Sequence, residues 1–226
     1  MSIHFHRALD NLKNRLLLLS ARVEENLRRA VDALERKDAE LARKVIDGDD
    51  EIDQMEVEVE EECLEALALH QPVAVDLRLV VSALKINNDL ERVGDLSVNI
   101  AERAEYLATQ DLTDIAFDFH AMAEKTQWML RKSLDAFVNT DPALAREVCR
   151  ADDDVDALNR RMYHIVEESV QTNPEQAQKL MHLLSVARHM ERIADLATNI
   201  SEDDIYMVEG EIVRHRVERY IPPDPN

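Results

Sequence analysis

The sequence is poor in the residues that interrupt helices. Among 226 residues there are only 3 glycines and 6 prolines, and aromatic residues make up 4% of the chain. Glycine and proline are the residues that most strongly break a helix, so their scarcity favours long helices. Three glycines are also too few to build a glycine-rich loop that grips phosphate.

Cysteine is equally scarce. Cys63 and Cys149 are the only two in the chain, and they lie in different halves of it, each within a partly apolar segment. We therefore expect two reduced, partly buried thiols rather than a disulfide or a thiolate metal site.

Long apolar runs are also missing. The longest, LLLLSA after Arg15 and LVVSAL after Arg78, are far too short to cross a bilayer. The first residues, MSIHFHRALDNLKNRL, are amphipathic and lack the apolar core of a signal peptide. We expect a cytoplasmic protein that does not insert into a membrane.

Basic residues are outnumbered. Lysine and arginine together number 27 and the acidic residues 47, which gives a net charge of -20. Nothing in that balance offsets the repulsion of phosphate groups, so nucleic acid is excluded as a partner and an anionic lipid surface is disfavoured. The charge fits metal cations or a basic patch on a protein partner, or it simply keeps the protein soluble.

Apolar residues recur at helical spacing over six segments. Breaks at Lys37-Asp38, Gln71-Pro72, Asn139–Pro142 and Thr172–Pro174 separate most of them. The predicted helices cover about residues 5–37, 39–70, 74–107, 113–138, 142–171 and 175–205, the last with an extension to Val217. Gly48 is the weak point of the second helix. The fold class is therefore all-α.

The second half of the chain repeats the first. LERVGDLSVNI at residues 90–100 matches MERIADLATNI at 190–200, with six of eleven positions identical, and VIDGDDEIDQM at 45–55 matches VCRADDDVDAL at 148–158. Each half contains three helices with short connections, which make neighbouring helices antiparallel. We predict two tandem three-helix bundles, residues 5–108 and 113–217, related by a pseudo-twofold axis and lying side by side or end to end, followed by a flexible tail at 218–226.

The repeated phrase places oxygen-bearing side chains in columns. Residues four apart share a helix face, so Glu91, Asp95 and Asn99 form one column, and the equivalent residues of the second half form another. Asp53 and Glu91 lie about equally far from the turn near residue 72, so at 1.5 Å per residue they stand at the same height. Asp156 and Glu191 do the same around residue 173. Packed carboxylates must share protons or hold a cation.

Two other readings of the columns stay open. Acidic pairs at this spacing are common in so acidic a chain and can form a solvated face with ion pairs along the helix. Arg92 and Arg192, which the repeat also keeps, could neutralise the carboxylates instead.

All-oxygen ligands suit magnesium, manganese, calcium or iron and argue against zinc and copper. Di-iron bundles use a Glu-x-x-His motif on a helix, and none of the eight histidines has a glutamate three residues before it. No serine or cysteine has a recognisable triad context. The sequence therefore shows none of these catalytic motifs.

The repeated acidic phrase in a six-helix frame resembles the PhoU family of phosphate-uptake regulators. Its motif, an acidic residue followed four positions later by aspartate, occurs once in each half as Glu91–Asp95 and Glu191–Asp195. The segment DDIYMVEGEIVRH at residues 203–215 resembles the usual end of the family. The resemblance spans nearly the whole chain, from about His6 to His215.

The resemblance implies a cytoplasmic negative regulator of the phosphate-starvation response, and not an enzyme. Such proteins are thought to act as adaptors between the ATPase subunit of the phosphate ABC transporter and a sensor histidine kinase. It also implies a metal cofactor, iron, magnesium or manganese, bound by Asp53, Glu91, Asp95, Asn99, Asp156, Glu191, Asp195 and Asn199. A homodimer is expected. Competing hypotheses are an iron-storage or oxidase bundle and a purely structural helical module.

Overall fold

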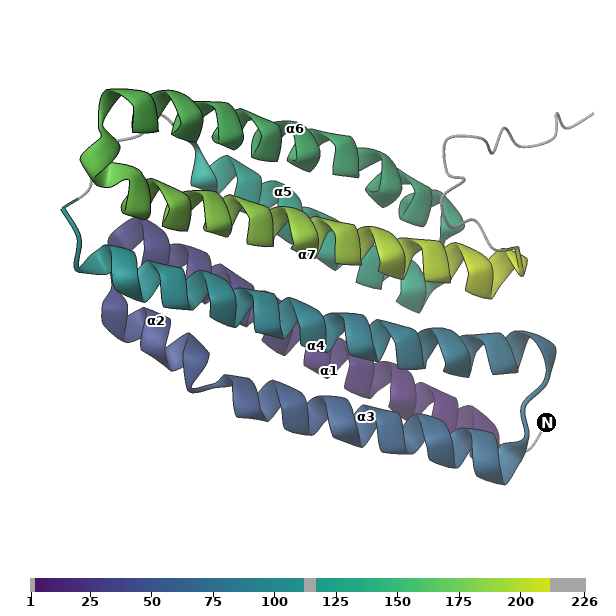
Figure 1. The fold of residues 1–226 in the computed structure, drawn as a ribbon. Coiled ribbons are helices and arrows are strands. Elements are labelled where there is room, and N and C mark those ends of the chain that lie inside the picture. The colour runs from purple at the N-terminus through teal and green to yellow at the C-terminus, as the bar shows by residue number, and fades with distance from the viewer. Residues whose placement is uncertain (1–2, 112–116, 212–226) are drawn as a thin grey trace, which may run out of the picture.

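The structure, a computed structural model, describes residues 3–111 and 117–211. Over those residues the secondary structure is helical and matches the predicted fold class (Figure 1). The elements are α1 (Ile3–Arg36), α2 (Ala39–Ile46), α3 (Asp49–His70), α4 (Ala74–Ala108), α5 (Phe119–Asn139), α6 (Pro142–Thr172), the short 3-10 turn η1 (Pro174–Gln176) and α7 (Ala177–Glu209). Within this part of the chain, no helix is long and apolar enough to span a membrane.

The second predicted helix is broken. Residues 39–70 form α2 and α3, separated at Asp47-Gly48, so the prediction of one continuous helix is wrong there. Gly48 has little preference for a helix interior, and Asp49, Asp50 and Glu51 follow it directly. Acidic residues are stabilising in the first turn of a helix, so the sequence favours a new helix start after the glycine.

Two helices of the second bundle, α5 and α6, begin at capping aspartates. The side chain of Asp118 accepts a hydrogen bond from Ala121 N at 2.9 Å, and that of Asp141 accepts from Leu144 N at 3.1 Å. Such caps satisfy amide groups that the first turn leaves without a partner. The predicted helix begins at residue 113, but α5 begins only after its cap at Asp118, so the prediction is wrong at residues 117–118. Residues 113–116 lie outside the described residues.

The last helix ends at a glycine. Gly210 has φ of +75° and donates its backbone N–H to Tyr206 O at 2.8 Å, a left-handed C-terminal cap that glycine adopts without steric cost. The predicted extension beyond residue 209 is therefore wrong at residues 210–211. Its remainder and the predicted tail at 218–226 lie outside the described residues.

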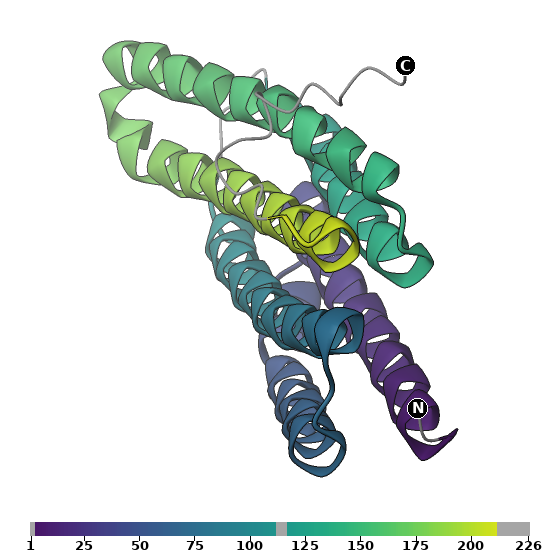
Figure 2. The same ribbon diagram turned by 90° about the vertical axis from the view of Figure 1, so that its right-hand side faces the viewer.

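The two bundles lie side by side (Figures 1 and 2). The helices α4 and α7 pack antiparallel along the seam between them, and one apolar core runs through both bundles. Lys85 Nζ of α4 lies 2.9 Å from Asp203 Oδ1 of α7 and 5.7 Å from the ring centre of Tyr206. At the other end of α4, the rings of Tyr106 and His182 lie 4.2 Å apart. The third helices of the two repeats therefore meet at the middle of the molecule.

Candidate functional site

Carboxylates of α3 and α4 gather on one face of the first bundle. This first acidic cluster consists of Asp49, Asp53, Glu91 and Asp95. Burial, with Asp53, Asp95 and Asp50 nearby, raises the pKa of Asp49 to about 6. The Oδ1 atom of Asp49 is buried, and no group among the described residues donates a hydrogen bond to it. The cluster therefore concentrates negative charge in a partly desolvated place.

Gly94 explains how α3 comes so close to α4. A β-carbon placed on Gly94 would lie 3.4 Å from Asp49 Oδ1 and 3.2 Å from Ile52 Cγ2. Because Gly94 has no side chain, the Asp49 carboxylate can approach the backbone of α4 at this point. Gly94 lies between Glu91 and Asp95, the two acidic residues of the motif on the same helix. Asp49 precedes Asp53 by one helical turn, so the two residues share a face of α3. That spacing could have added Asp49 to the predicted ligands.

The second bundle repeats the arrangement. This second acidic cluster consists of Asp152, Asp156, Glu191 and Asp195. Burial, followed by the charges of Asp195 and Asp156, raises the pKa of Asp152 to about 6. The pKa of Asp195 is raised as well, by burial and by Asp156. A similar electrostatic environment therefore occurs in both halves of the duplication.

The predicted heights of the facing residues agree with the structure. Asp53 on α3 is one of the charges that raise the pKa of Glu91 on α4, after burial and Asp95. Asp156 on α6 acts in the same way on Glu191 of α7. The acidic residues of neighbouring helices therefore do face one another in each bundle, as their distances from the turns predict.

The donor set of both clusters fits a hard cation, since every candidate ligand is an oxygen atom. Among the described residues, however, no group of three or more acidic, histidine or cysteine side chains is already arranged to hold an ion. Carboxylate side chains would have to rotate to close a coordination shell. Cys63 and Cys149 are free thiols, and burial raises the pKa of each to about 12, which disfavours a thiolate ligand.

Asn99 and Asn199, the last residues of the two predicted columns, also border the space between the two bundles. They line a cavity of about 270 Å³ between α4 and α7, together with Arg92, Asp95, Leu96, Arg192, Asp195 and Leu196. The Asn99 side chain donates to Asp95 O at 2.8 Å, within its own helix. The repeated phrase thus lines both an acidic cluster and the cavity, which lies at the centre of the duplication.

Arg92 and Arg192, the arginines of the repeated segment, do not neutralise the motif carboxylates directly. Arg92 NH1 lies 3.6 Å from Asp89 Oδ1, and among the described residues neither Arg92 nor Arg192 forms an ion pair within its own motif. Arg192 does lower the pKa of Asp195 through space. Both side chains border the shared cavity, so their repetition reflects the α4–α7 seam as well as the clusters.

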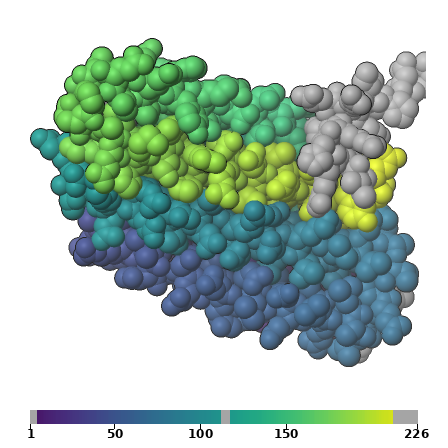
Figure 3. All heavy atoms as spheres, viewed as in Figure 1, coloured from purple at the N-terminus to yellow at the C-terminus, as the bar shows by residue number. Residues whose placement is uncertain are grey.

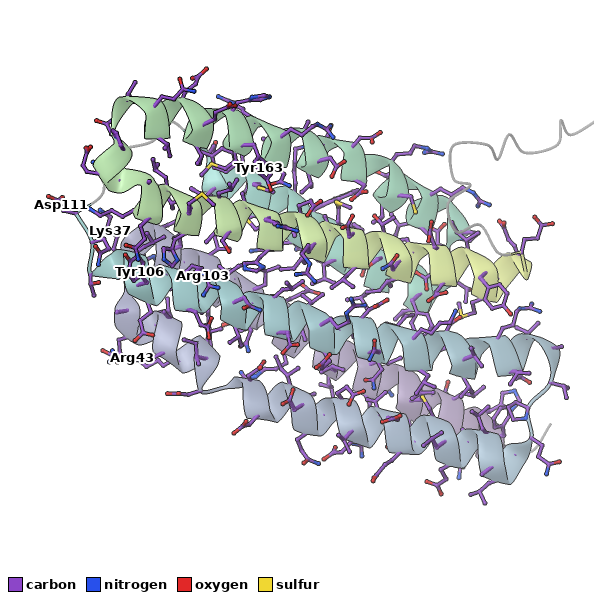
Figure 4. The ribbon with its side chains drawn as sticks, in the orientation of Figure 1. Lys37, Arg43, Arg103, Tyr106, Asp111 and Tyr163 are labelled. Atoms are coloured by element: carbon purple, nitrogen blue, oxygen red, sulfur yellow. The ribbon has the colours of Figure 1, made fainter. Side chains whose placement is uncertain are left out.

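The seam becomes more basic toward the end of α4, where Figure 4 labels Arg103 and Tyr106. His189 of α7 accepts or donates a hydrogen bond with Ser185 Oγ at 3.1 Å. Burial, then Arg103, Arg192 and Arg188, lower the pKa of His189 to about 4. A neutral histidine among arginines is not a feature that the spacing of the sequence reveals.

Comparison with known proteins matches the PhoU domain twice, over residues 16–104 and 119–203. The chain belongs to the PhoU family. A phosphate-specific transport system accessory protein PhoU homolog from Aquifex aeolicus is 41% identical over 214 residues, which cover 93% of this chain and 95% of the relative. The phosphate-specific transport system accessory protein PhoU of Escherichia coli is 32% identical, over 95% of this chain and 89% of the relative.

Solved structures agree with the fold of this PhoU family member. The crystal structure of PhoU from Pseudomonas aeruginosa superimposes with a TM-score of 0.85 and 33% identity, over 92% of this chain and 100% of that chain. The phosphate transport system regulatory protein PhoU from Streptococcus pneumoniae gives 0.83 and 31%, over 92% and 99%. The chain is thus a regulatory accessory protein of phosphate transport and not an enzyme.

Proposed function

We propose that this PhoU family protein is a cytoplasmic negative regulator of phosphate uptake and of the phosphate-starvation response. It acts as an adaptor between the ATPase subunit of the phosphate ABC transporter and a sensor histidine kinase. A metal ion in each acidic cluster stabilises the regulator. The observation that supports the metal sites best is the pair of matching clusters, one in each repeat, with raised carboxylate pKa values in both.

A bound cation would relieve the repulsion inside each cluster. Asp49 and Asp53 come from α3, whereas Glu91 and Asp95 come from α4, so an ion between them would hold the two helices together. The same holds for α6 and α7 in the second cluster. Iron, magnesium and manganese all suit such oxygen ligands. The role of the metal is then to clamp helices rather than to catalyse a reaction.

The metal proposal is tested by neutralising the motif carboxylates. The variant Glu91→Gln/Asp95→Asn/Glu191→Gln/Asp195→Asn, purified without chelator, should carry less metal by elemental analysis and native mass spectrometry. A matched control removes as much charge from exposed positions outside the clusters, at Glu124, Glu147, Glu167 and Glu168. Equal metal content in the wild type and both variants would favour a purely structural bundle.

The adaptor proposal is tested in cells. Deleting the gene should raise phosphate-regulated expression while phosphate is abundant, and the wild-type gene should restore repression. Purified protein should bind the cytoplasmic region of the sensor kinase and the transporter ATPase of the same organism. Unchanged expression after deletion would contradict the regulatory role, and oxygen consumption on anaerobic loading with ferrous iron followed by air would instead favour an iron oxidase.

A further inference from the structure

Apolar side chains lie exposed along α3, in the turn that follows it and at the start of α4. We call this set the apolar edge and define it as Val57, Leu64, Leu69, Val73 and Val75. Their exposed fractions are 45%, 52%, 67%, 73% and 57%. Val57 and Leu64 are seven residues apart and share the outer face of α3. At about 100° per residue, Leu69 lies about 140° farther round the helix than Leu64, so the set continues around the end of α3 toward the turn. Single exposed apolar residues are ordinary, but several in one short stretch of chain indicate a contact surface.

The apolar edge belongs to a helix with a one-sided charge. The 22 residues of α3 include ten aspartates and glutamates and no lysine or arginine. The helix forms an outer edge of the first bundle, where it packs mainly against α1 and α4 (Figures 1 and 3). Arg15 of α1 pairs with Glu58 and Glu62, and Arg22 of α1 pairs with Glu51, but three carboxylates neutralised in this way leave α3 strongly acidic. Any partner that covers the apolar edge therefore meets an acidic helix.

The turn after α3 has a costly backbone conformation at two residues, one on each side of Val73. Gln71 and Ala74 have φ values of 46° and 50°, in the left-handed region that residues other than glycine rarely adopt. Between them, Val73 is the most exposed residue of the apolar edge. Strain of this kind persists where the surroundings demand it, and it gathers at contact and functional sites.

The second repeat shows that the bundle itself does not need these apolar residues. At offsets of 103 on α6 and 100 in the turn, the equivalents of the apolar edge are Arg160, Glu167, Thr172, Asn173 and Glu175. All five equivalents are polar, although they lie at the corresponding end of the second bundle, on α6 and in the connection that follows it. The apolar edge is therefore a specialisation of the first repeat.

We propose that the apolar edge is the docking site for an amphipathic helix of a partner protein, whose apolar face is bordered by lysine and arginine. The exposed apolar side chains give such a contact its affinity, and the carboxylates of α3 select a basic partner. A second copy of this chain is disfavoured, because it would bring two acidic α3 helices together. This inference deepens the adaptor proposal, on which it rests, by naming the surface that the partner uses.

The test replaces the apolar edge with polar residues of the kind that the second repeat carries. The variant Leu64→Gln/Leu69→Thr/Val73→Asn/Val75→Gln changes no charge, and its exposed positions should leave the thermal unfolding curve unchanged. Its affinity for the kinase cytoplasmic region or the transporter ATPase should fall by about tenfold or more for the protein that docks here. The control Met181→Gln/Val208→Thr alters exposed apolar residues elsewhere and should bind like the wild type.

The outcomes separate this inference from the adaptor proposal. If the wild type binds a partner and the edge variant binds it equally well, the docking site is wrong while the adaptor role stands. If the wild type binds neither protein, the adaptor role fails. The surface is then tested with a designed leucine-lysine helical peptide of about 18 residues, and equal peptide binding by both chains overturns the inference. A wild-type dimer that the edge variant makes monomeric, measured by sedimentation, would identify a second copy as the occupant and would also overturn it.

Discussion

The β-carbon that Gly94 lacks would lie 3.2 Å from Ile52 Cγ2 and 3.4 Å from Ile52 Cδ1. The first distance is shorter than most real contacts of a β-carbon, so this pair leaves almost no spare room between α3 and α4. The second repeat has Ala194 and Val155 at the equivalent positions, and both are buried. One repeat combines the larger side chain with glycine, whereas the other combines the smaller side chain with alanine.

We therefore expect Gly94→Ala and Ile52→Val to compensate each other in part, because valine keeps Cγ2 but lacks the Cδ1 methyl group that the new β-carbon would meet. Alone, Ile52→Val should cost about 0.5–1.5 kcal/mol of unfolding free energy. Alone, Gly94→Ala should gain less than the roughly 1 kcal/mol of its helix propensity, because the new methyl group crowds Ile52. The double variant should be more stable than the sum of the two changes by about 0.5–1 kcal/mol. Denaturant unfolding of all four proteins measures this coupling, and strict additivity would show that the contact is slack.

The acidic clusters predict a dependence of stability on pH in protein stripped of metal. In the folded state the pKa values of Asp49 and Asp152 are about 6, against 3.8 for the unperturbed group. The folded state thus binds more protons than the unfolded state between about pH 4 and pH 6. The unfolding free energy should fall as the pH rises through that window. Thermal unfolding of chelator-treated protein at several pH values measures it.

Two comparisons make the pH experiment specific. The variant Asp49→Asn/Asp152→Asn should show a shallower fall than the wild type over the same window, because the two groups no longer titrate. Saturating manganese should reverse the trend, since deprotonated carboxylates bind the ion and the bound ion stabilises the fold. A wild type whose curve matches that of the variant would mean that the clusters are well solvated.

Much of the fold follows from periodicity and capping residues, but the breaks within it depend on local competition. Asp141-Pro142 marks a helix start that the structure confirms, because a side-chain cap and a proline act together there. Gly48 is harder to interpret, since a single glycine in an amphipathic pattern is often tolerated. The acidic residues behind it decide the outcome, and their preference for a helix start exceeds the gain from continuing the helix.

The candidate site was predictable where it depends on height along helices and not where it depends on rotation about them. Distances from the turns place Asp53 opposite Glu91 correctly. They do not reveal that Asn99 borders the seam between the bundles, because that requires the packing of α4 against α7. Whether the bundles lie side by side or end to end also depends on the packing of α4 against α7, and the sequence leaves that choice open.

The cap of α6 should contribute measurably to stability. Asp141 Oδ1 accepts hydrogen bonds from Ala143 N at 3.0 Å and Leu144 N at 3.1 Å. Replacing the side chain in Asp141→Ala leaves both amides without this partner and should cost about 1 kcal/mol. Asp141→Asn should lose much less, because its amide oxygen can accept the same bonds. Urea unfolding of the two variants tests the cap, and equal losses would instead point to the charge of Asp141.

Asp204 should destabilise the protein at high pH, whereas Asp141 stabilises it. The Asp204 side chain is buried, and neither of its carboxylate oxygens has a hydrogen-bond partner among the described residues. Burial, together with Asp203, raises the pKa of Asp204 well above its ordinary value. The folded protein therefore holds a proton on this group that the unfolded chain releases near its ordinary pKa, so its contribution to the unfolding free energy decreases as the pH rises.

Replacing the buried acid in Asp204→Asn removes this titration. The variant should stabilise the protein at about pH 8 by on the order of 1–3 kcal/mol. The gain should be smaller at about pH 4.5, because that pH lies close to the ordinary pKa of 3.8, where ionisation of Asp204 favours the unfolded chain only slightly. Unfolding midpoints at the two pH values decide the matter, and the solvent-exposed Asp154→Asn serves as the control. If Asp204→Asn instead lowers stability at the higher pH, the Asp204 carboxylate must have a partner in solution, because a buried charge without a partner does not stabilise the fold.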